Sequence, residues 1–245
     1  MNAQSHECTV ARRWPARHPE RLQLYSAATP NGAKVSIMLE ETGLPYEAHW
    51  IDVLGGETHT AEYLSLNPAG KIPAIVDPDG PAGKALQLCE SAAILLYLAE
   101  KTGIFLPTDP QLYWQTQQWL YFQMASIGPM FGQVGYFNKF AGRAIEDLRP
   151  RQRYVDESRR LLDLLDRQLA AGPWIMGPEY GLVDIATLGW VNNLITFYEA
   201  RSLVGFDDFR NVAAWLERGL TRPAVKRGLA IPPRPDAVSS VPTIP

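Results

Sequence analysis

Three short segments carry the polar side chains whose types and spacing suit ligand chemistry. They are Thr29-Pro30-Asn31-Gly32, Lys71-Ile72-Pro73 and Glu90-Ser91, and each lies at the end of a predicted strand or helix. The first segment joins a predicted strand to a predicted helix, which places it at the carboxyl edge of an open sheet, where ligands bind. The N–H groups and positive dipole end of that helix favour an anion.

Each segment also has an ordinary structural explanation. Thr29 and Asn31 either donate to an anion, or Asn31 caps the helix while Thr29 packs in the turn. The Ile72–Pro73 bond is either a common trans bond or a cis bond that exposes the Ile72 backbone to an extended ligand. The Glu90-Ser91 pair either begins a capped helix or binds an ammonium and a carboxylate.

The composition excludes several classes of protein. The chain has 245 residues, of which 46% are hydrophobic, enough for two folded domains. The net charge of −3 means that the chain lacks the excess of basic residues that is typical of proteins that bind nucleic acid. With no apolar run of membrane-spanning length and no secretory signal, we expect a cytoplasmic protein that binds neither nucleic acid nor membrane.

The cysteine count limits thiol chemistry. Cys8 and Cys89 are the two cysteines, and no C-x-x-C spacing exists for a zinc site or a redox dithiol, so we expect no metal. Cys89 precedes Glu90 and is either a redox residue or a small buried side chain, and the frequency at which cysteine is buried favours the second.

The hydrophobic pattern divides the chain into two halves between an arm and a tail. The first half predicts strands at 21–25, 46–53, 72–76 and 84–88 and helices at 33–43, 61–66 and 91–101, in the order β-α-β-α-β-β-α. The second half predicts helices at 111–122, 154–171, 182–198, 209–218 and 223–229. The predicted divisions are a flexible arm over 1–20, an α/β domain over 21–103, a linker over 104–110, an all-helical domain over 111–230 and a Pro-rich tail over 231–245.

Within this order of elements, three stretches carry a resemblance to a known family. They are Thr29-Pro30-Asn31-Gly32-Ala33-Lys34, Asn67 to Asp77 and Glu90 to Gly103, with further matches at 128–133 and 153–154. The chain resembles the glutathione transferases, and within them the bacterial nu-class group related to the yeast nitrogen-regulating prion protein. The resemblance implies a thioredoxin-like N-terminal domain that binds glutathione and an all-α C-terminal domain.

The resemblance also assigns roles to the three segments. Ile72, next to a cis-Pro73, would pair through its backbone with the cysteinyl part of glutathione, and Lys71 would bind the glycine carboxylate. The Glu90-Ser91 pair would hold the γ-glutamyl end. The charges of these residues complement the two carboxylates and one ammonium of glutathione.

The same resemblance places Thr29 and Asn31 at the sulfur, and Arg153 where it would contact a second glutathione. A free thiol has a pKa of about 8.5, and lowering this pKa by about two units requires about 2.7 kcal/mol of stabilisation of the thiolate relative to the thiol. Two hydrogen bonds to the thiolate contribute about 1.5–3 kcal/mol each, and together with a helix N-terminus they are enough to lower the pKa by this amount. For Arg153 the alternative is a solvated helix face.

The sequence departs from the family pattern at several positions. Tyr25 lies on the predicted strand, too early to be the thiolate-binding tyrosine of many transferases. Thr58, with His59 beside it, replaces the glutamine that often contacts glutathione. Gly181 precedes Asp184 in the capping box of the central helix and supplies no hydroxyl, so half of the reciprocal box is lost.

The resemblance implies a homodimeric, glutathione-dependent disulfide-bond reductase that uses glutathione as co-substrate. Its partners would be glutathione or glutathione disulfide and a small-molecule disulfide or electrophile. Two alternatives remain open: conjugation of glutathione to electrophiles, and a non-catalytic glutathione-binding regulatory module.

Overall fold

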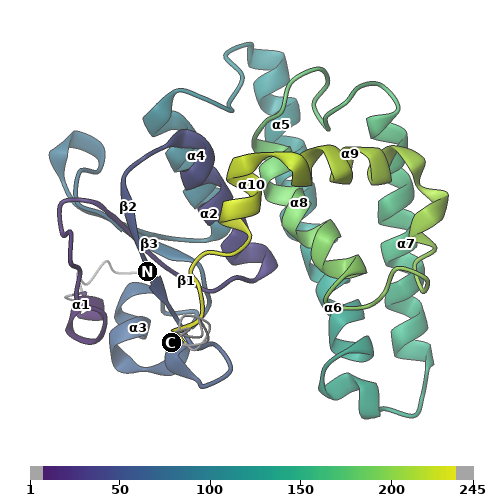
Figure 1. Cartoon of the computed structure of the whole chain (residues 1–245), viewed down its shortest axis with the longest axis horizontal. Coiled ribbons are helices and arrows are strands. Elements are labelled where there is room, and N and C mark those ends of the chain that lie inside the picture. The colour runs from purple at the N-terminus through teal and green to yellow at the C-terminus, as the bar shows by residue number, and fades with distance from the viewer. Residues whose placement is uncertain (1–7, 236–245) are drawn as a thin grey trace, which may run out of the picture. The chain divides into compact units, whose positions relative to one another are not determined.

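The computed structural model describes residues 8–235, and these form two units, each with its own internal contacts (Figure 1). One unit holds the described residues up to Leu98 and those from Arg227 onward, and the other spans Ala99–Lys226. The sequence assigns the residues after Arg227 to the helical domain and the tail instead. They join the first unit because the Ser36 hydroxyl donates to the Gly228 carbonyl at 2.6 Å and Arg227 pairs with Glu40.

The first unit contains a four-stranded sheet in the order β2-β1-β3-β4. Its strands are β1 (Leu22–Ser26), β2 (Tyr46–Trp50), β3 (Ala74–Asp77) and β4 (Leu86–Cys89). Strand β1 is parallel to β2 and antiparallel to β3, which is antiparallel to β4. The helices are α1 (Val10–Arg13), α2 (Pro30–Thr42), α3 (Ala61–Leu66) and α4 (Ser91–Thr102).

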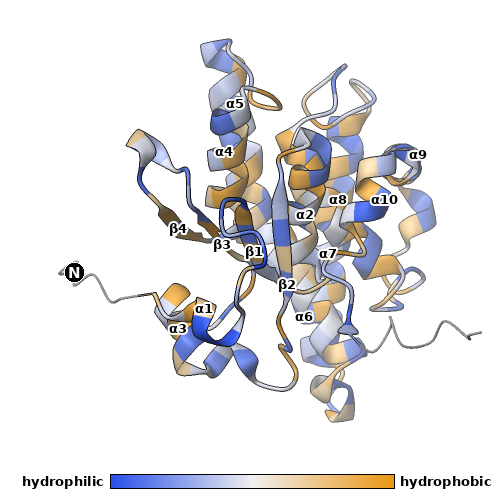
Figure 2. Ribbon diagram, turned by 60° about the vertical axis from the view of Figure 1, so that its left-hand side comes forward, coloured by the Kyte–Doolittle hydropathy of each residue, from blue (hydrophilic) through white to orange (hydrophobic). Residues whose placement is uncertain are grey.

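The helices cover both faces of this sheet. Figures 1 and 2 show α2 and α4 on one face and α3 with α1 on the other. The predicted order β-α-β-α-β-β-α and the thioredoxin-like class of the N-terminal domain are confirmed.

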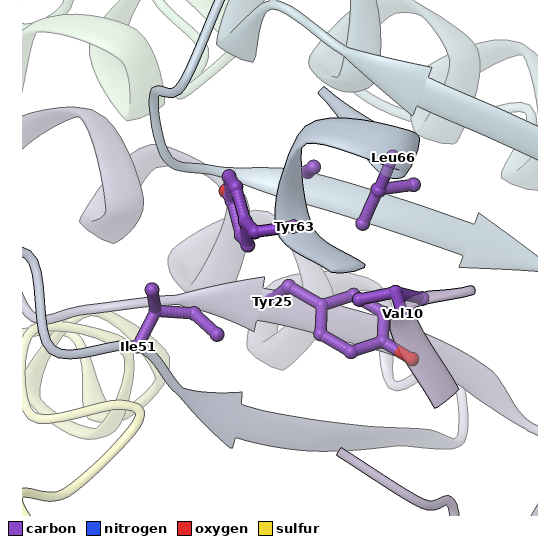
Figure 3. Packing of buried hydrophobic residues seen from close by; sticks show 6 residues of the cluster. Val10, Tyr25, Ile51, Tyr63 and Leu66 are labelled. Carbon is purple, nitrogen blue, oxygen red and sulfur yellow. The ribbon is translucent and has the colours of Figure 1, made fainter. Parts of the chain in front are cut away.

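The described part of the predicted flexible arm is packed on the sheet instead. Val10 is 2% exposed and belongs to a core cluster with Tyr25 and Tyr63, and Figure 3 shows these side chains together. Trp14 packs edge-on against the same two tyrosine rings, with centroids 6.4 and 6.1 Å away. Burial of these apolar side chains stabilises the segment on its own domain. Residues 1–7 of the arm and 236–245 of the tail lie outside the described residues.

The second unit is built from helices. Its long helices are α5 (Pro110–Phe122), α6 (Gly128–Asn138), α7 (Arg149–Leu169), α8 (Leu182–Ile195) and α9 (Arg210–Thr221), with a π-helical turn (Gln123–Ile127) between α5 and α6. The short helix α10 (Pro223–Gly228) begins in this unit, and its last two residues belong to the first unit. Helix α9 is amphipathic and buries Val212, Trp215 and Leu216, and Figure 2 shows its mixed hydropathy. Among the helices of the described residues, none has the length and apolar character needed to cross a membrane.

Asp184 connects three parts of this helical unit. Its Oδ2 accepts from the Gly181 N–H at 3.0 Å, so the half of the capping box that glycine permits is formed. Its Oδ1 accepts from the Ile175 N–H at 3.0 Å and from the Trp215 indole N–H at 2.7 Å. Burial raises the pKa of Asp184 to about 6, while these three hydrogen bonds act in the opposite direction.

Replacing Asp184 should destabilise the helical unit. Asp184→Ala leaves the buried N–H groups of Ile175 and Trp215 and the half-buried N–H of Gly181 without their acceptor, and we expect the free energy of unfolding to fall by about 3–5 kcal/mol in urea titrations. Asp184→Asn keeps an oxygen for Ile175 and Trp215 but turns an amide toward the Gly181 N–H, so its loss should be smaller. Equal stability of Asp184→Ala and the wild-type protein would contradict the capping role.

Candidate active site

The register of the sheet brings the three polar segments to one edge. Tyr25 of β1 pairs with Ala74 of β3, which pairs with Cys89 of β4. The chain therefore leaves β1 toward Thr29, enters β3 from Pro73 and leaves β4 toward the Glu90-Ser91 pair, all at the same end of the three strands. All seven residues that the sequence predicts for the glutathione site in the N-terminal half lie in this unit.

Thr29 forms the N-cap of α2. Its backbone is extended, with φ −107° and ψ 165°, and its Oγ1 accepts from the Gly32 N–H at 3.2 Å. Thr29, and not Asn31, therefore caps the helix through its side chain, while Asn31 lies half-buried in the first turn. A hydroxyl that accepts one hydrogen bond still has its own proton to donate to a ligand atom beyond the helix end.

Gly32 allows the chain to turn tightly before α2. A Cβ atom built at this position would lie 2.0 Å from the Ala27 carbonyl oxygen, so no other residue fits without movement of the backbone. The close approach keeps Thr29 and the first N–H groups of α2 against the carboxyl end of β1.

The loop before β3 is held from within the domain. The Lys71 carbonyl accepts from the Tyr63 hydroxyl at 2.8 Å and from the Asn67 amide at 2.6 Å. The Ile72–Pro73 bond is cis, the alternative that the sequence resemblance favours. The Lys71 residue itself is exposed and Ile72 is half-buried, so both are accessible to an extended ligand beside β3.

Glu90 and Ser91 form the junction between β4 and α4. Glu90 is exposed and has φ +68°, a left-handed conformation that costs a residue with a side chain and is concentrated at functional sites. Its carbonyl accepts the Ile94 N–H at 3.0 Å, so Glu90 is the N-cap residue that precedes the first residue of α4. Ser91 is only 3% exposed and occupies the first position of the helix.

A buried lysine lies beneath this junction. Lys34 of α2 is 1% exposed, and its ammonium donates to the Ser91 Oγ at 3.2 Å. Burial lowers the pKa of Lys34 to about 7, and the Glu90 carboxylate partly offsets this effect. The sequence assigns no role to Lys34, because a single lysine among apolar positions of a helix does not show that its head group is buried.

Other candidates for thiol chemistry have different surroundings. Tyr25 lies in β1, is 2% exposed and stacks on His49 with ring centroids 4.6 Å apart, and burial raises the pKa of its hydroxyl. Ser26 is fully buried and donates to the Ala27 carbonyl. Burial also raises the pKa of the Cys89 thiol, which reduces its thiolate fraction at neutral pH.

Thr58 and His59 lie near the loop before β3. Thr58 is 2% exposed, so its side chain is within the fold, whereas His59 is exposed. The His59 ring lies against Gly70, where an added Cβ atom would be 3.1 Å from it. Within residues 8–235 no group of three or more histidine, cysteine or acidic side chains is arranged to hold a metal ion.

Arg153 belongs to the helical unit. It lines a pocket of about 670 Å³ between α6 and α7, together with Met130, Tyr154, Asp156, Glu157 and Arg160. The Arg160 guanidinium bonds Glu157 at 2.6 Å and holds the pKa of that carboxyl below its usual value. The Tyr154 ring stacks on Phe137, with centroids 5.7 Å apart. The Arg153 charge also acts on the Glu157 carboxylate and contributes to the lowering of its pKa.

Comparison with known proteins assigns the family. Models of the glutathione S-transferase N-terminal and C-terminal domains match residues 28–101 and 149–218. The chain belongs to the glutathione transferase family, and the architecture that the sequence resemblance implies is confirmed.

Two relatives from Escherichia coli are named disulfide-bond oxidoreductases. YfcG is 40% identical over 210 residues, which cover 85% of this chain and 94% of YfcG. YghU is 37% identical over 236 residues, which cover 93% of this chain and 79% of YghU. These relatives support the assignment of the chain as an enzyme of this kind.

Solved structures of similar proteins contain glutathione. A glutathione transferase from Pseudomonas putida, with one glutathione disulfide bound per subunit, is 57% identical with a TM-score of 0.90, covering 92% of this chain and 97% of that one. A glutathione transferase from Burkholderia graminis, with two glutathione molecules bound per subunit, is 55% identical with a TM-score of 0.91, covering 96% and 98%.

Lys34 should make the stability of the protein depend on pH. The pKa of Lys34 is about 7 in the folded chain, whereas an unfolded lysine titrates near about 10.4. Between these values the unfolded chain binds the additional proton, so the free energy of unfolding rises with pH. From pH 7 to pH 9 we expect the Lys34 contribution to rise by about 2 kcal/mol.

Urea titrations at several pH values can measure this contribution as the difference between the wild-type protein and Lys34→Met. Lys84→Met is the matched control, because Lys84 is exposed. Its pH profile should parallel that of the wild-type protein. Parallel profiles for Lys34→Met and the wild-type protein would show that Lys34 titrates normally.

Proposed function

We propose that the chain is a glutathione-dependent disulfide-bond reductase in which the thiolate of bound glutathione is the nucleophile. The observation that carries this proposal is the Thr29 hydroxyl at the N-terminus of α2, with its proton available to a sulfur atom. The N-terminus of a helix of this length favours a negative charge. The names of the two relatives from Escherichia coli and the glutathione disulfide in the related structure support the same reaction.

The edge of the sheet offers complementary groups for each part of glutathione. The Ile72 backbone beside cis-Pro73 would pair with the cysteinyl residue, in the manner of an added strand. The exposed Lys71 would bind the glycine carboxylate. Glu90 would bind the γ-glutamyl ammonium, while Ser91 and the N-terminus of α4 would bind its carboxylate.

The reaction is two thiol–disulfide exchanges. The glutathione thiolate attacks one sulfur of a disulfide, a mixed disulfide forms, and the other sulfur leaves as a thiolate that takes a proton. A second glutathione thiolate attacks the glutathione sulfur of the mixed disulfide and releases the second thiol. Two glutathione molecules are oxidised to glutathione disulfide, and one disulfide is reduced to two thiols.

Arg153 would bind a carboxylate of the second glutathione. The enzyme would act as a homodimer in the cytoplasm. The positions of Arg153 and Arg160 in one pocket on α7 support a role in anion binding, although the Glu157 carboxylate of the same pocket also interacts with the Arg153 charge. Transfer of glutathione to an electrophile is the competing reaction. A rate with a chlorodinitroarene far above the rate with a small disulfide would favour conjugation, whereas tight glutathione binding without either turnover would favour a regulatory module.

Removal of both cysteines should leave the activity intact. We expect a Cys8→Ala/Cys89→Ala variant to reduce a small disulfide with glutathione at a rate close to that of the wild-type protein, because the reactive sulfur arrives with the ligand. Cys89 packs against the core cluster, so a modest loss of stability is expected. Loss of all turnover in Cys89→Ala, with an unchanged circular dichroism spectrum, would exclude this mechanism.

Thr29 should lower the pKa of the bound thiol. Thr29→Val removes a hydrogen bond to a charged sulfur, worth about 1.5–3 kcal/mol, so the pKa should rise by about 1–2 units. Thr29→Ser keeps the hydroxyl and should leave the pKa near the wild-type value. Titration of the ultraviolet absorbance of the thiolate measures the pKa directly, and identical values for Thr29→Val and the wild-type protein would exclude the role of Thr29.

A further inference from the structure

Strand β2 forms one edge of the four-stranded sheet. It pairs with β1 alone, and Figure 2 shows it at the end of the sheet opposite to β4. The Ile51 N–H donates to the Ser26 carbonyl at 2.8 Å, and in a parallel pair alternate residues bond the neighbouring strand, so the odd-numbered residues of β2 direct their backbone groups toward β1. The N–H and C=O groups of Tyr46, Ala48 and Trp50 therefore point away from the sheet.

The N-terminal arm flanks this edge without pairing with it. A groove of about 710 Å³ lies between residues 13–18 of the arm and β2, and Pro235 also lines it. The Arg17 and His18 N–H groups donate to the Glu47 carboxylate at 2.9 and 2.8 Å, so the arm is held by a side chain of β2 and not by its backbone. Within residues 8–235, no backbone group of the arm bonds the backbone of β2. The edge of β2 is thus open to an additional strand.

The side chains of β2 give the two sides of the groove different character, because successive side chains of a strand point to opposite faces. Tyr46, Ala48 and Trp50 share one face, and the small Ala48 lies between the two large aromatic residues. Glu47 and His49 share the other face, on the side that the arm contacts. An added strand can therefore place an apolar side chain beside Ala48 and polar side chains on the face of Glu47.

The groove carries an excess of positive charge. Arg13, Arg17 and His18 line it together with one carboxylate, that of Glu47. Glu47 already accepts from two N–H groups of the arm, and Arg13 pairs with Glu57 at 2.8 Å. The Arg17 side chain is exposed, and in the part of the chain that the structure describes its guanidinium forms no ion pair. Acidic side chains complement this charge.

We propose that this groove binds an extended, acidic segment of a partner protein, which adds to the edge of β2 as a fifth strand. The backbone of the segment bonds the outward groups of Tyr46, Ala48 and Trp50, and an apolar side chain lies beside Ala48. Its acidic side chains alternate with the apolar ones and face Arg17. The proposal concerns a surface apart from the candidate active site, and it does not depend on glutathione or on its reaction.

Binding can be measured by fluorescence anisotropy of a fluorescein-labelled peptide of alternating valine and glutamate, added to the full-length protein. We expect saturable binding of this peptide. A peptide of alternating valine and lysine should bind much more weakly, because its charge has the same sign as that of the groove. The valine–glutamate peptide with an N-methylated backbone should also bind weakly, since it has no N–H groups to donate to β2.

Two variants test the strand pairing and the charge. Ala48→Pro removes an outward N–H but no bond to β1, and proline is tolerated on edge strands, so affinity should fall about tenfold or more with an unchanged circular dichroism spectrum. Arg17→Gln should weaken binding about two- to fivefold. Arg21→Gln is the matched control, because Arg21 is exposed and lies outside the groove, and it should bind like the wild-type protein.

Hydrogen exchange of the wild-type protein tests the proposal without a variant. Bound peptide should slow exchange of the backbone amides in residues 46–50. Absence of binding, binding without this protection, or equal binding of the N-methylated peptide would overturn the proposal. Binding that requires removal of residues 236–245 would show that the tail occupies the groove, and separation of two copies of the chain by the peptide would show that a second copy does. Either result would also overturn the proposal.

Discussion

The register of β3 between β1 and β4 is the constraint on which the candidate active site depends. Because Tyr25, Ala74 and Cys89 lie side by side across these strands, the adjoining loops must meet at one edge of the sheet. A shift of one residue would turn the buried side chains of these strands outward, so the hydrophobic core itself fixes the register. The site thus follows from the packing of the sheet, and the loops add the cap at Thr29 and the left-handed turn at Glu90.

The chemistry at this edge is assembled from partial charges more than from reactive side chains. The beginnings of α2 and α4 present N–H groups, Lys34 adds a buried positive charge, and Glu90 supplies a negative one. Both cysteines of the chain lie against the core cluster that contains Val10, Tyr25 and Tyr63, and burial there raises the pKa of Cys89. Such a site would suit a ligand that brings its own thiol, as the proposed reaction requires.

Much of this arrangement was predictable from the sequence, because it depends on local patterns. Hydrophobic periodicity predicted the order of strands and helices, and the motif at Thr29 predicted a helix start. Features that depend on tertiary packing were not predictable. Nothing local shows that Lys34 is buried under Ser91, that Val10 joins the core and anchors the described part of the arm, or that Thr29 caps α2 in preference to Asn31.

The most direct test of the account is a crystal structure of the protein soaked with oxidised glutathione. The account predicts one tripeptide along β3, with its cysteinyl backbone on Ile72, its γ-glutamyl carboxylate at Ser91 and its sulfur within hydrogen-bond distance of the Thr29 hydroxyl. A tripeptide bound elsewhere in the chain, or one joined through its sulfur to Cys89, would contradict the claim that the reactive sulfur belongs to the ligand.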